Sequence, residues 1–233
     1  ETDAQPMDWH LIRASVRLVA DTVHHRRVFL AILAISFFWT IGAVLFIQFP
    51  PLAKNVLAAS KEVASLFLVV FSIGVAIGSM GINALLKGTV SARYAPASVV
   101  AMGLCIVAFH VICRLWTPHP ADGLLDVARF IAEPLAIPLL LSLLGIAIGG
   151  GMFVVPLYAF LTTSVEKSQT ARTIAANNIV NSGAMVIGSL LAVALSAAGV
   201  SVVDQLLLSA AMCLVSAWLG RLLYRAELAH EPI

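Results

Sequence analysis

Six long hydrophobic runs, separated by short polar stretches, occupy most of the chain. Each run has the roughly 20 apolar residues that a helix needs to cross the hydrocarbon core of a bilayer. Inside the runs, apolar and polar residues do not alternate with the period of two that is typical of barrel strands. The pattern therefore predicts an all-α integral membrane protein, a six-transmembrane-helix bundle with spans at residues 28–49, 63–86, 95–116, 134–163, 173–198 and 202–224.

The first hydrophobic run ends at two consecutive prolines, Pro50 and Pro51. Proline has no backbone N–H to donate to a helix, and it restricts the conformation of the residue before it. We therefore expect the first spanning helix to stop at this pair.

The polar segment before the first span has a pattern of its own. Hydrophobic residues recur at helical spacing from Ile12 to Val23, while Arg13, Arg17 and Asp21 fall on another face. This pattern predicts an amphipathic helix on the membrane surface, although an ordinary helical connector is an alternative. The chain then divides into a cytoplasmic connector, the bundle and a cytoplasmic tail, at residues 1–27, 28–224 and 225–233.

Composition strengthens the membrane prediction and excludes several other classes. Hydrophobic residues make up 61% of the chain and charged residues only 11%, whereas soluble domains carry about 25% charged residues. No basic run predicts a nucleic-acid partner. The three cysteines lie in apolar stretches, and the histidines lack metal-ligand spacing. We therefore predict no catalytic residue, no metal and no cofactor, and we do not expect this chain to be an enzyme.

Basic residues beside the spans predict the orientation of the bundle. With six spans, both termini and the second and fourth loops share one face. That face receives ten of the 14 Lys and Arg residues, and the opposite face receives Lys54, Lys61, Arg114 and Arg129. The positive-inside rule then places both termini in the cytoplasm.

Small residues at helical spacing predict close contacts between helices. Gly74 and Gly78 are four residues apart in the second span, and Gly145 and Gly149 are four apart in the fourth. Glycines at this spacing let two helix backbones approach. An alternative is that these glycines allow helices to slide or bend during a transport cycle.

Three asparagines form the most polar cluster inside a span: Asn177, Asn178 and Asn181. Polar side chains at such depth usually face the bundle interior or a wet cavity. They could hold helices together by hydrogen bonds, or they could line a cavity that contacts a polar head group. Gln48 and His110 lie near the outer ends of their spans, where we expect them at the membrane interface.

Several segments resemble a known transporter family. Six spans after a basic amphipathic connector resemble the C-terminal half of a major facilitator superfamily transporter. The segments Phe153–Ala159 and Ile174–Asn181, together with Phe37–Trp39 and Phe71–Gly74, look like the lysophospholipid transporter branch of that superfamily. The resemblance implies one six-helix half of a transporter, with a substrate cavity lined by Asn177, Asn178, Asn181, Tyr158 and Trp39.

The resemblance also implies a substrate, partners and a location. In that branch, lysophospholipid, chiefly lysophosphatidylethanolamine, crosses the bacterial inner membrane for re-acylation. The expected partners are the membrane lipid substrate, a missing N-terminal six-helix half or a second copy forming a homodimer, and a fused or associated acyltransferase. Two other functions stay open: a major facilitator carrier of another small or amphipathic solute, and a membrane anchor or scaffold for a fused acyltransferase.

Overall fold

The computed structural model describes residues 13, 16–20, 26–117 and 123–229. Six of its helices are long and apolar enough to span a membrane, and regular strands are absent from the described residues. The protein is therefore an all-α, multi-pass membrane protein, as the hydrophobic pattern predicts. The spans are α2 (Arg26–Asn55), α3 (Lys61–Leu86), α4 (Ala95–Leu115), α6 (Ala136–Thr163), α7 (Thr170–Ala197) and α8 (Val202–Leu228).

Most of the predicted connector lies outside the described residues. Arg13 and residues 16–20 are helical, and Val16 is exposed. Ile12, Asp21 and Val23 are not described, so the predicted amphipathic face stays a prediction.

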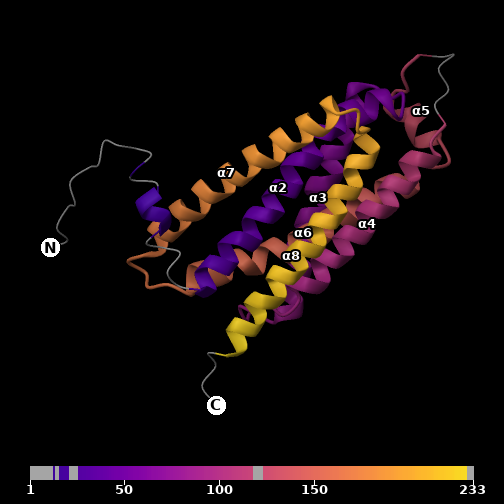
Figure 1. The fold of residues 1–233 in the computed structure, drawn as a ribbon. Coiled ribbons are helices and arrows are strands. Elements are labelled where there is room, and N and C mark those ends of the chain that lie inside the picture. The colour runs from indigo at the N-terminus through magenta and orange to yellow at the C-terminus, as the bar shows by residue number, and fades with distance from the viewer. Residues whose placement is uncertain (1–12, 14–15, 21–25, 118–122, 230–233) are drawn as a thin grey trace.

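The spans pack side by side as a closed bundle with one peripheral member (Figure 1). α6 packs between α3 and α4, α4 packs against α8, and α2 touches α8, α6 and α3. α7 packs chiefly against α2 and lies at the edge of the bundle. Its other faces carry exposed apolar side chains such as Ile187, Leu190 and Val193. The start of α2 and the end of α8 lie at the same end of the bundle.

Glycine allows α3 to lie directly on α6. A Cβ atom built on Gly78 would fall 2.2 Å from the carbonyl oxygen of Ile148, and one on Gly74 would fall 2.5 Å from Cβ of Ala147. Both distances are shorter than any ordinary contact. The predicted glycine pair of the second span therefore lies where two helix backbones meet.

The opposite side of α6 uses glycine in the same way against α4. A Cβ on Gly149 would lie 2.9 Å from the carbonyl oxygen of Ser98, and one on Gly145 would lie 2.6 Å from Sγ of Cys105. α6 is thus held closely on two sides, by α3 and by α4.

The prediction that α2 stops at Pro50 and Pro51 is wrong. Both prolines lie inside α2, which continues to Asn55. They remove two N–H donors, but the following turn is buried, with Leu52 0% and Ala53 1% exposed. Packing of this last turn against the bundle outweighs the lost backbone hydrogen bonds.

A short helix that the hydrophobic pattern did not predict closes the end of the bundle remote from the termini. α5 (Val127–Ala132) begins at Asp126, whose side chain accepts a hydrogen bond from the backbone N–H of Arg129. Its Phe130 is fully buried and packs on Phe67 and Trp116, with ring centroids 5.9 and 5.5 Å apart. Aromatic contacts of this kind join α5 to α3 and to the end of α4.

The last helix is longer than predicted. α8 runs to Leu228, so residues 225–228 of the predicted tail are helical. A carboxylate oxygen of Glu227 accepts a hydrogen bond from the backbone N–H of Ala92 at 2.9 Å. This contact ties the extra turn to the loop between α3 and α4.

Candidate functional site: a polar cluster between α2, α6 and α7

Side chains from three spans form a hydrogen-bonded cluster inside the bundle. The hydroxyl of Ser36 donates to Oδ1 of Asn181 at 2.6 Å, and Nδ2 of Asn181 donates to the phenol oxygen of Tyr158 at 3.4 Å. The indole N–H of Trp39 donates to the same oxygen at 2.8 Å. Three of the side chains predicted for a substrate cavity, Trp39, Tyr158 and Asn181, are therefore in contact.

The local sequence of α2 places its contributions on one face. Ser36, Trp39 and Thr40 are three and four residues apart, so they line one stripe of the helix. The Thr40 hydroxyl donates back to the carbonyl of Ser36 at 2.8 Å. On α7, a Cβ at Gly188 would fall 2.3 Å from Cγ2 of Thr40, so this glycine lets α7 approach α2.

Asn177 lies one turn before Asn181 on the same face of α7. It is 0% exposed, and neither atom of its amide has a hydrogen-bond partner among the described residues. A buried amide without partners costs about 1–3 kcal/mol relative to a paired one. The two N–H donors and the acceptor oxygen of the Asn177 amide therefore lie next to the cluster without a hydrogen-bond partner among the described residues.

Asn178 does not join the cluster. It is exposed, because consecutive helix residues point about 100° apart and Asn177 takes the buried direction. The structure therefore places Asn177 and Asn181 on the buried face of α7 and leaves Asn178 outside, and their role in a substrate site stays a prediction.

The cluster lies deep in the bundle. Asn181 is roughly 16 Å along the axis from the start of α7 at 1.5 Å per residue, near the middle of a helix of 28 residues. Trp39 and Tyr158 are half-buried, whereas Asn181 is 7% exposed. The phenol oxygen of Tyr158 accepts both of its bonds, so its own O–H remains to be donated.

Two further polar contacts were not predicted from the sequence. Gln48, near the end of α2, is 3% exposed, and its amide donates to Oε1 of Gln205 at 2.9 Å. Nε2 of Gln205 donates in turn to Ser196 at 2.8 Å. These bonds join α2, α7 and α8 on the side of the bundle away from the termini.

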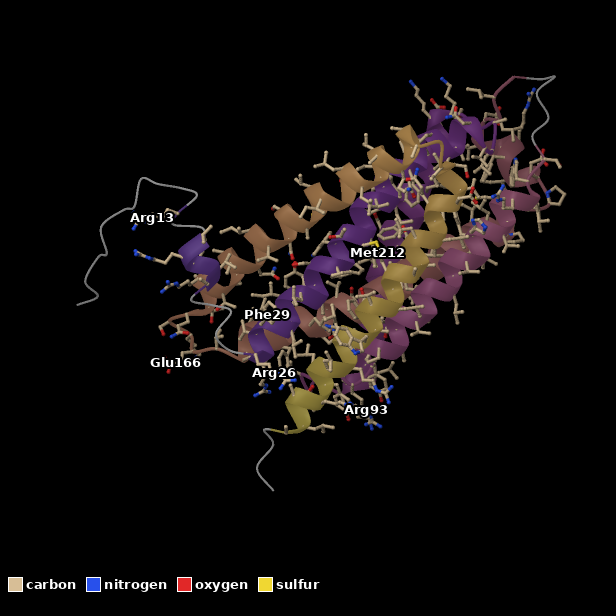
Figure 2. All side chains as sticks on the ribbon, viewed as in Figure 1. Arg13, Arg26, Phe29, Arg93, Glu166 and Met212 are labelled. Carbon is tan, nitrogen blue, oxygen red and sulfur yellow. The ribbon has the colours of Figure 1, made fainter. Side chains whose placement is uncertain are left out.

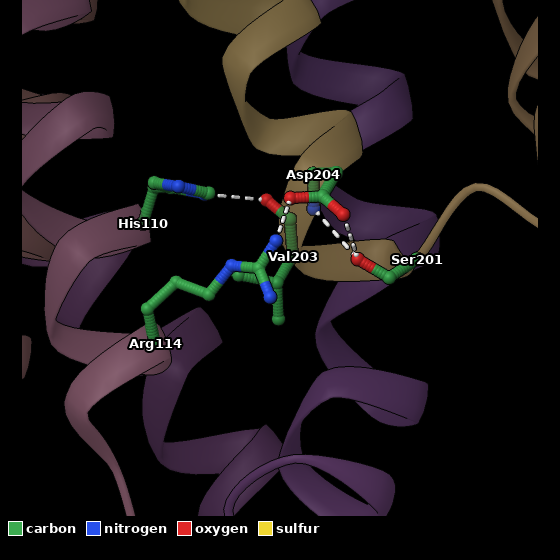
Figure 3. Close-up of polar contacts among 5 residues, drawn as sticks. All are labelled: His110, Arg114, Ser201, Val203 and Asp204. Carbon is green, nitrogen blue, oxygen red and sulfur yellow. Dashed lines mark hydrogen bonds and ion pairs between the residues drawn. The ribbon is translucent and has the colours of Figure 1, made fainter.

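A third polar contact joins α4 to the start of α8 at the same end (Figure 3). Nδ1 of His110 donates to the carbonyl of Val203 at 2.7 Å, and Arg114 forms an ion pair with Asp204. The Ser201 hydroxyl caps α8 by accepting from the backbone N–H of Asp204. Both members of the ion pair are exposed, so the contact closes a helix end and contributes little to stability.

The chemistry available in the cluster is hydrogen bonding. Its groups are hydroxyl, phenol, indole and amide, which donate and accept hydrogen bonds. Among the described residues, no group of three His, Cys, Asp or Glu side chains could hold a metal ion. No family model, curated protein or solved structure matches this chain. What the fold defines is its class, a multi-pass membrane protein with six apolar helices.

Proposed function

We propose that the protein is half of a membrane transporter that moves a lysophospholipid, similar to lysophosphatidylethanolamine, across the bacterial inner membrane for re-acylation. The observation that carries the proposal is the buried amide of Asn177, which lies beside the Ser36–Asn181–Tyr158 cluster and has no hydrogen-bond partner among the described residues. Bundles do not retain an unsatisfied amide for stability, because it costs free energy. A polar substrate group that binds transiently and forms hydrogen bonds with this amide would explain why the amide lies there.

The donors of the cluster suit a phosphate-containing head group. Asn177 has two N–H donors and Tyr158 one O–H donor that bond to no other described residue, and phosphate oxygens accept several such bonds. The surrounding spans α2 and α6 are strongly apolar. An amphipathic molecule with a polar head and one acyl chain matches a polar cluster in such walls.

A transporter of this kind needs a second wall for its cavity. Only 17% of the most apolar part of α7 is buried, so this span has room for a partner on its outer faces. We propose that a second six-helix half of the same polypeptide, or a second copy of this bundle, supplies that wall. A fused or associated acyltransferase would consume the transported lipid.

A membrane anchor or scaffold for an acyltransferase is the second candidate function. It is favoured by the bonds of Asn181, whose two amide atoms pair with Ser36 and Tyr158 and so hold three helices together. An anchor needs no substrate contact, so the two functions differ in whether these groups affect lipid movement. A carrier of another solute differs in the substrate that the same groups would bind.

Tyr158→Phe should lower lysophosphatidylethanolamine uptake several-fold in spheroplasts that express the protein. The change removes the phenol oxygen, at a cost that averages about 0.6 kcal/mol per hydrogen bond in membrane bundles, together with the spare donor. Tyr224→Phe is the matched control, because Tyr224 lies near the end of α8, outside the cluster. Equal uptake by both variants at equal expression would argue for the anchor, and selective loss of another solute would argue for a different carrier.

The proposed orientation places both termini and the α3–α4 and α6–α7 loops in the cytoplasm. Cysteines introduced at Lys87 and Lys167, in a background without the native cysteines, should react with a membrane-impermeant maleimide only after the membrane is opened. Lys54 lies at the opposite end of α2 and serves as the control that should react from outside. The reverse pattern of labelling would invert the orientation.

A further inference from the structure

A basic cavity lies at the end of the bundle that carries both the start of α2 and the end of α8. A cavity of about 470 Å³ opens there between three helix ends. Its described lining combines three arginines with several apolar residues: Arg26, Arg27, Val28, Ser164, Leu222, Arg225, Ala226 and Ala229. Figure 2 shows Arg26 at this end, beside the last turns of α8.

The described lining of this cavity has no negative charge to balance its arginines. Three arginines contribute to it, and none of its described lining residues is acidic. The nearest acidic residue on α8, Glu227, is bonded to the backbone N–H of Ala92 and does not line the cavity. Arg26 and Arg225 are exposed and Arg27 is half-buried, and the positive charge of all three would attract an anion that enters the cavity.

Arg27 is held in place with part of its donor capacity unused. Its guanidinium lies 5.2 Å from the ring centroid of Phe160, which fixes its plane by a cation–π contact. Its Nε is buried and has no hydrogen-bond partner among the described residues. A buried guanidinium N–H without an acceptor is costly, and it marks the position where an oxygen of a ligand would bind.

We propose that this arginine cavity binds the phosphate group of an anionic ligand. The planar forks of Arg26, Arg27 and Arg225 match the oxygens of a phosphate, which they can bind bidentately. Ser164 adds a hydroxyl at the end of α6.

The position of the cavity favours a phospholipid head group as the source of that phosphate. It lies at the ends of three spans, which is the depth of the head groups in a bilayer. Val28, Leu222 and Ala226 add apolar surface to the lining, which suits the first carbons of a lipid next to its phosphate. Basic pockets between spanning helices are known to bind anionic head groups. The site is separate from the Asn181 cluster, so it does not depend on the proposed transport.

The test measures lipid binding to the purified chain by native mass spectrometry from micelles with equal amounts of phosphatidylglycerol and phosphatidylcholine. The wild-type chain should retain phosphatidylglycerol preferentially. The double variant R27Q/R225Q should weaken this binding by about tenfold or more, because two charge-assisted contacts are lost. The matched control is R93Q/R221Q, which removes two arginines outside the described lining of the cavity: Arg93 at the same end of the bundle (Figure 2) and Arg221 in the last turns of α8.

Ala229→Glu is a second variant that keeps all three arginines. Ala229 is exposed at the end of α8, so the change should not affect folding, but it adds a carboxylate to the lining. It should weaken phosphatidylglycerol binding by repulsion. Equal retention of the two lipids, or equal losses in the control and cavity variants, would overturn the proposal.

Competition with inorganic phosphate tests whether the cavity recognises a free phosphate ion or the head group of a lipid. If added phosphate competes with phosphatidylglycerol in the wild type but not in R27Q/R225Q, the cavity recognises the phosphate group alone. If only the lipid binds, the apolar surface of the lining contributes and the ligand is a head group. Binding of neither phosphate nor lipid would show that the arginines form no anion site.

Discussion

Gly78→Ala should destabilise the bundle, whereas Gly81→Ala, one turn further along the same helix, should not. The added Cβ at Gly78 would fall 2.2 Å from the carbonyl oxygen of Ile148, which belongs to the backbone of α6. No rotamer change can move a backbone oxygen, so α3 and α6 would have to separate. Gly81 has no atom of the described residues within 4 Å of its would-be Cβ.

The expected effects at the two glycines differ in sign. Inserting a methyl group into a tight contact typically costs about 1–3 kcal/mol, and occasionally more. Replacing glycine by alanine in an open helix position gains up to about 1 kcal/mol through helix propensity. Gly78→Ala should therefore be less stable than the wild type, and Gly81→Ala should be equally or more stable.

Thermal unfolding in detergent, followed by circular dichroism, checks this prediction on both variants under the same conditions. Parallel changes in both midpoints would mean that the backbone contact between α3 and α6 does not hold the bundle together. Gly78→Leu should enlarge the effect, because the longer side chain forces the two backbones further apart.

The six spans were predictable from the sequence because a bilayer imposes the same two constraints on each spanning helix. A helix in lipid must satisfy its own backbone and present about 20 apolar residues, and both features are visible in one dimension. The ends of the helices were less predictable. Pro50 and Pro51 normally stop a helix, but the buried turn that follows them depends on contacts with distant residues. α5 is too short to give a hydrophobic signal of its own.

The polar cluster was predictable only in part. Asn181 stands out because an amide inside an apolar span is rare, and Tyr158 and Trp39 were included through the resemblance. Ser36 gave no signal, because a single hydroxyl is common in membrane helices, yet it forms the shortest bond of the cluster. Gln205 was missed because it lies in the first turn of α8, where polar residues are expected. Pairs that form across helices cannot be identified from one sequence without knowing which faces meet.

Substitutions of the two buried asparagines of α7 distinguish a role in stability from a role in substrate binding. Asn181 uses both ends of its amide in bonds to Ser36 and Tyr158, so it contributes to holding three helices together. Asn177 is equally buried but uses neither end among the described residues. Replacing each by leucine, which has a similar volume, should therefore change stability in opposite directions.

Asn177→Leu should stabilise the bundle and reduce transport. Removing a buried amide without partners recovers up to about 1–3 kcal/mol, and Asn181→Leu should instead cost about 0.6 kcal/mol per lost bond, with a maximum near 1.7. If the Asn177 amide receives the head group, its loss should lower lysophosphatidylethanolamine uptake several-fold even though the protein is more stable. A variant that gains stability and loses activity cannot owe its defect to misfolding.

Asn178→Leu is the matched control, because Asn178 is the neighbouring amide and is exposed. Its replacement should change neither the unfolding midpoint nor the uptake rate. Unchanged uptake in Asn177→Leu would remove the substrate contact from the proposal and favour the membrane anchor. A lower midpoint for Asn177→Leu would mean that its amide acquires partners in the bilayer, and the cluster would then serve to hold α7 on α2. Stability and uptake measured on the three variants in one membrane preparation distinguish these cases.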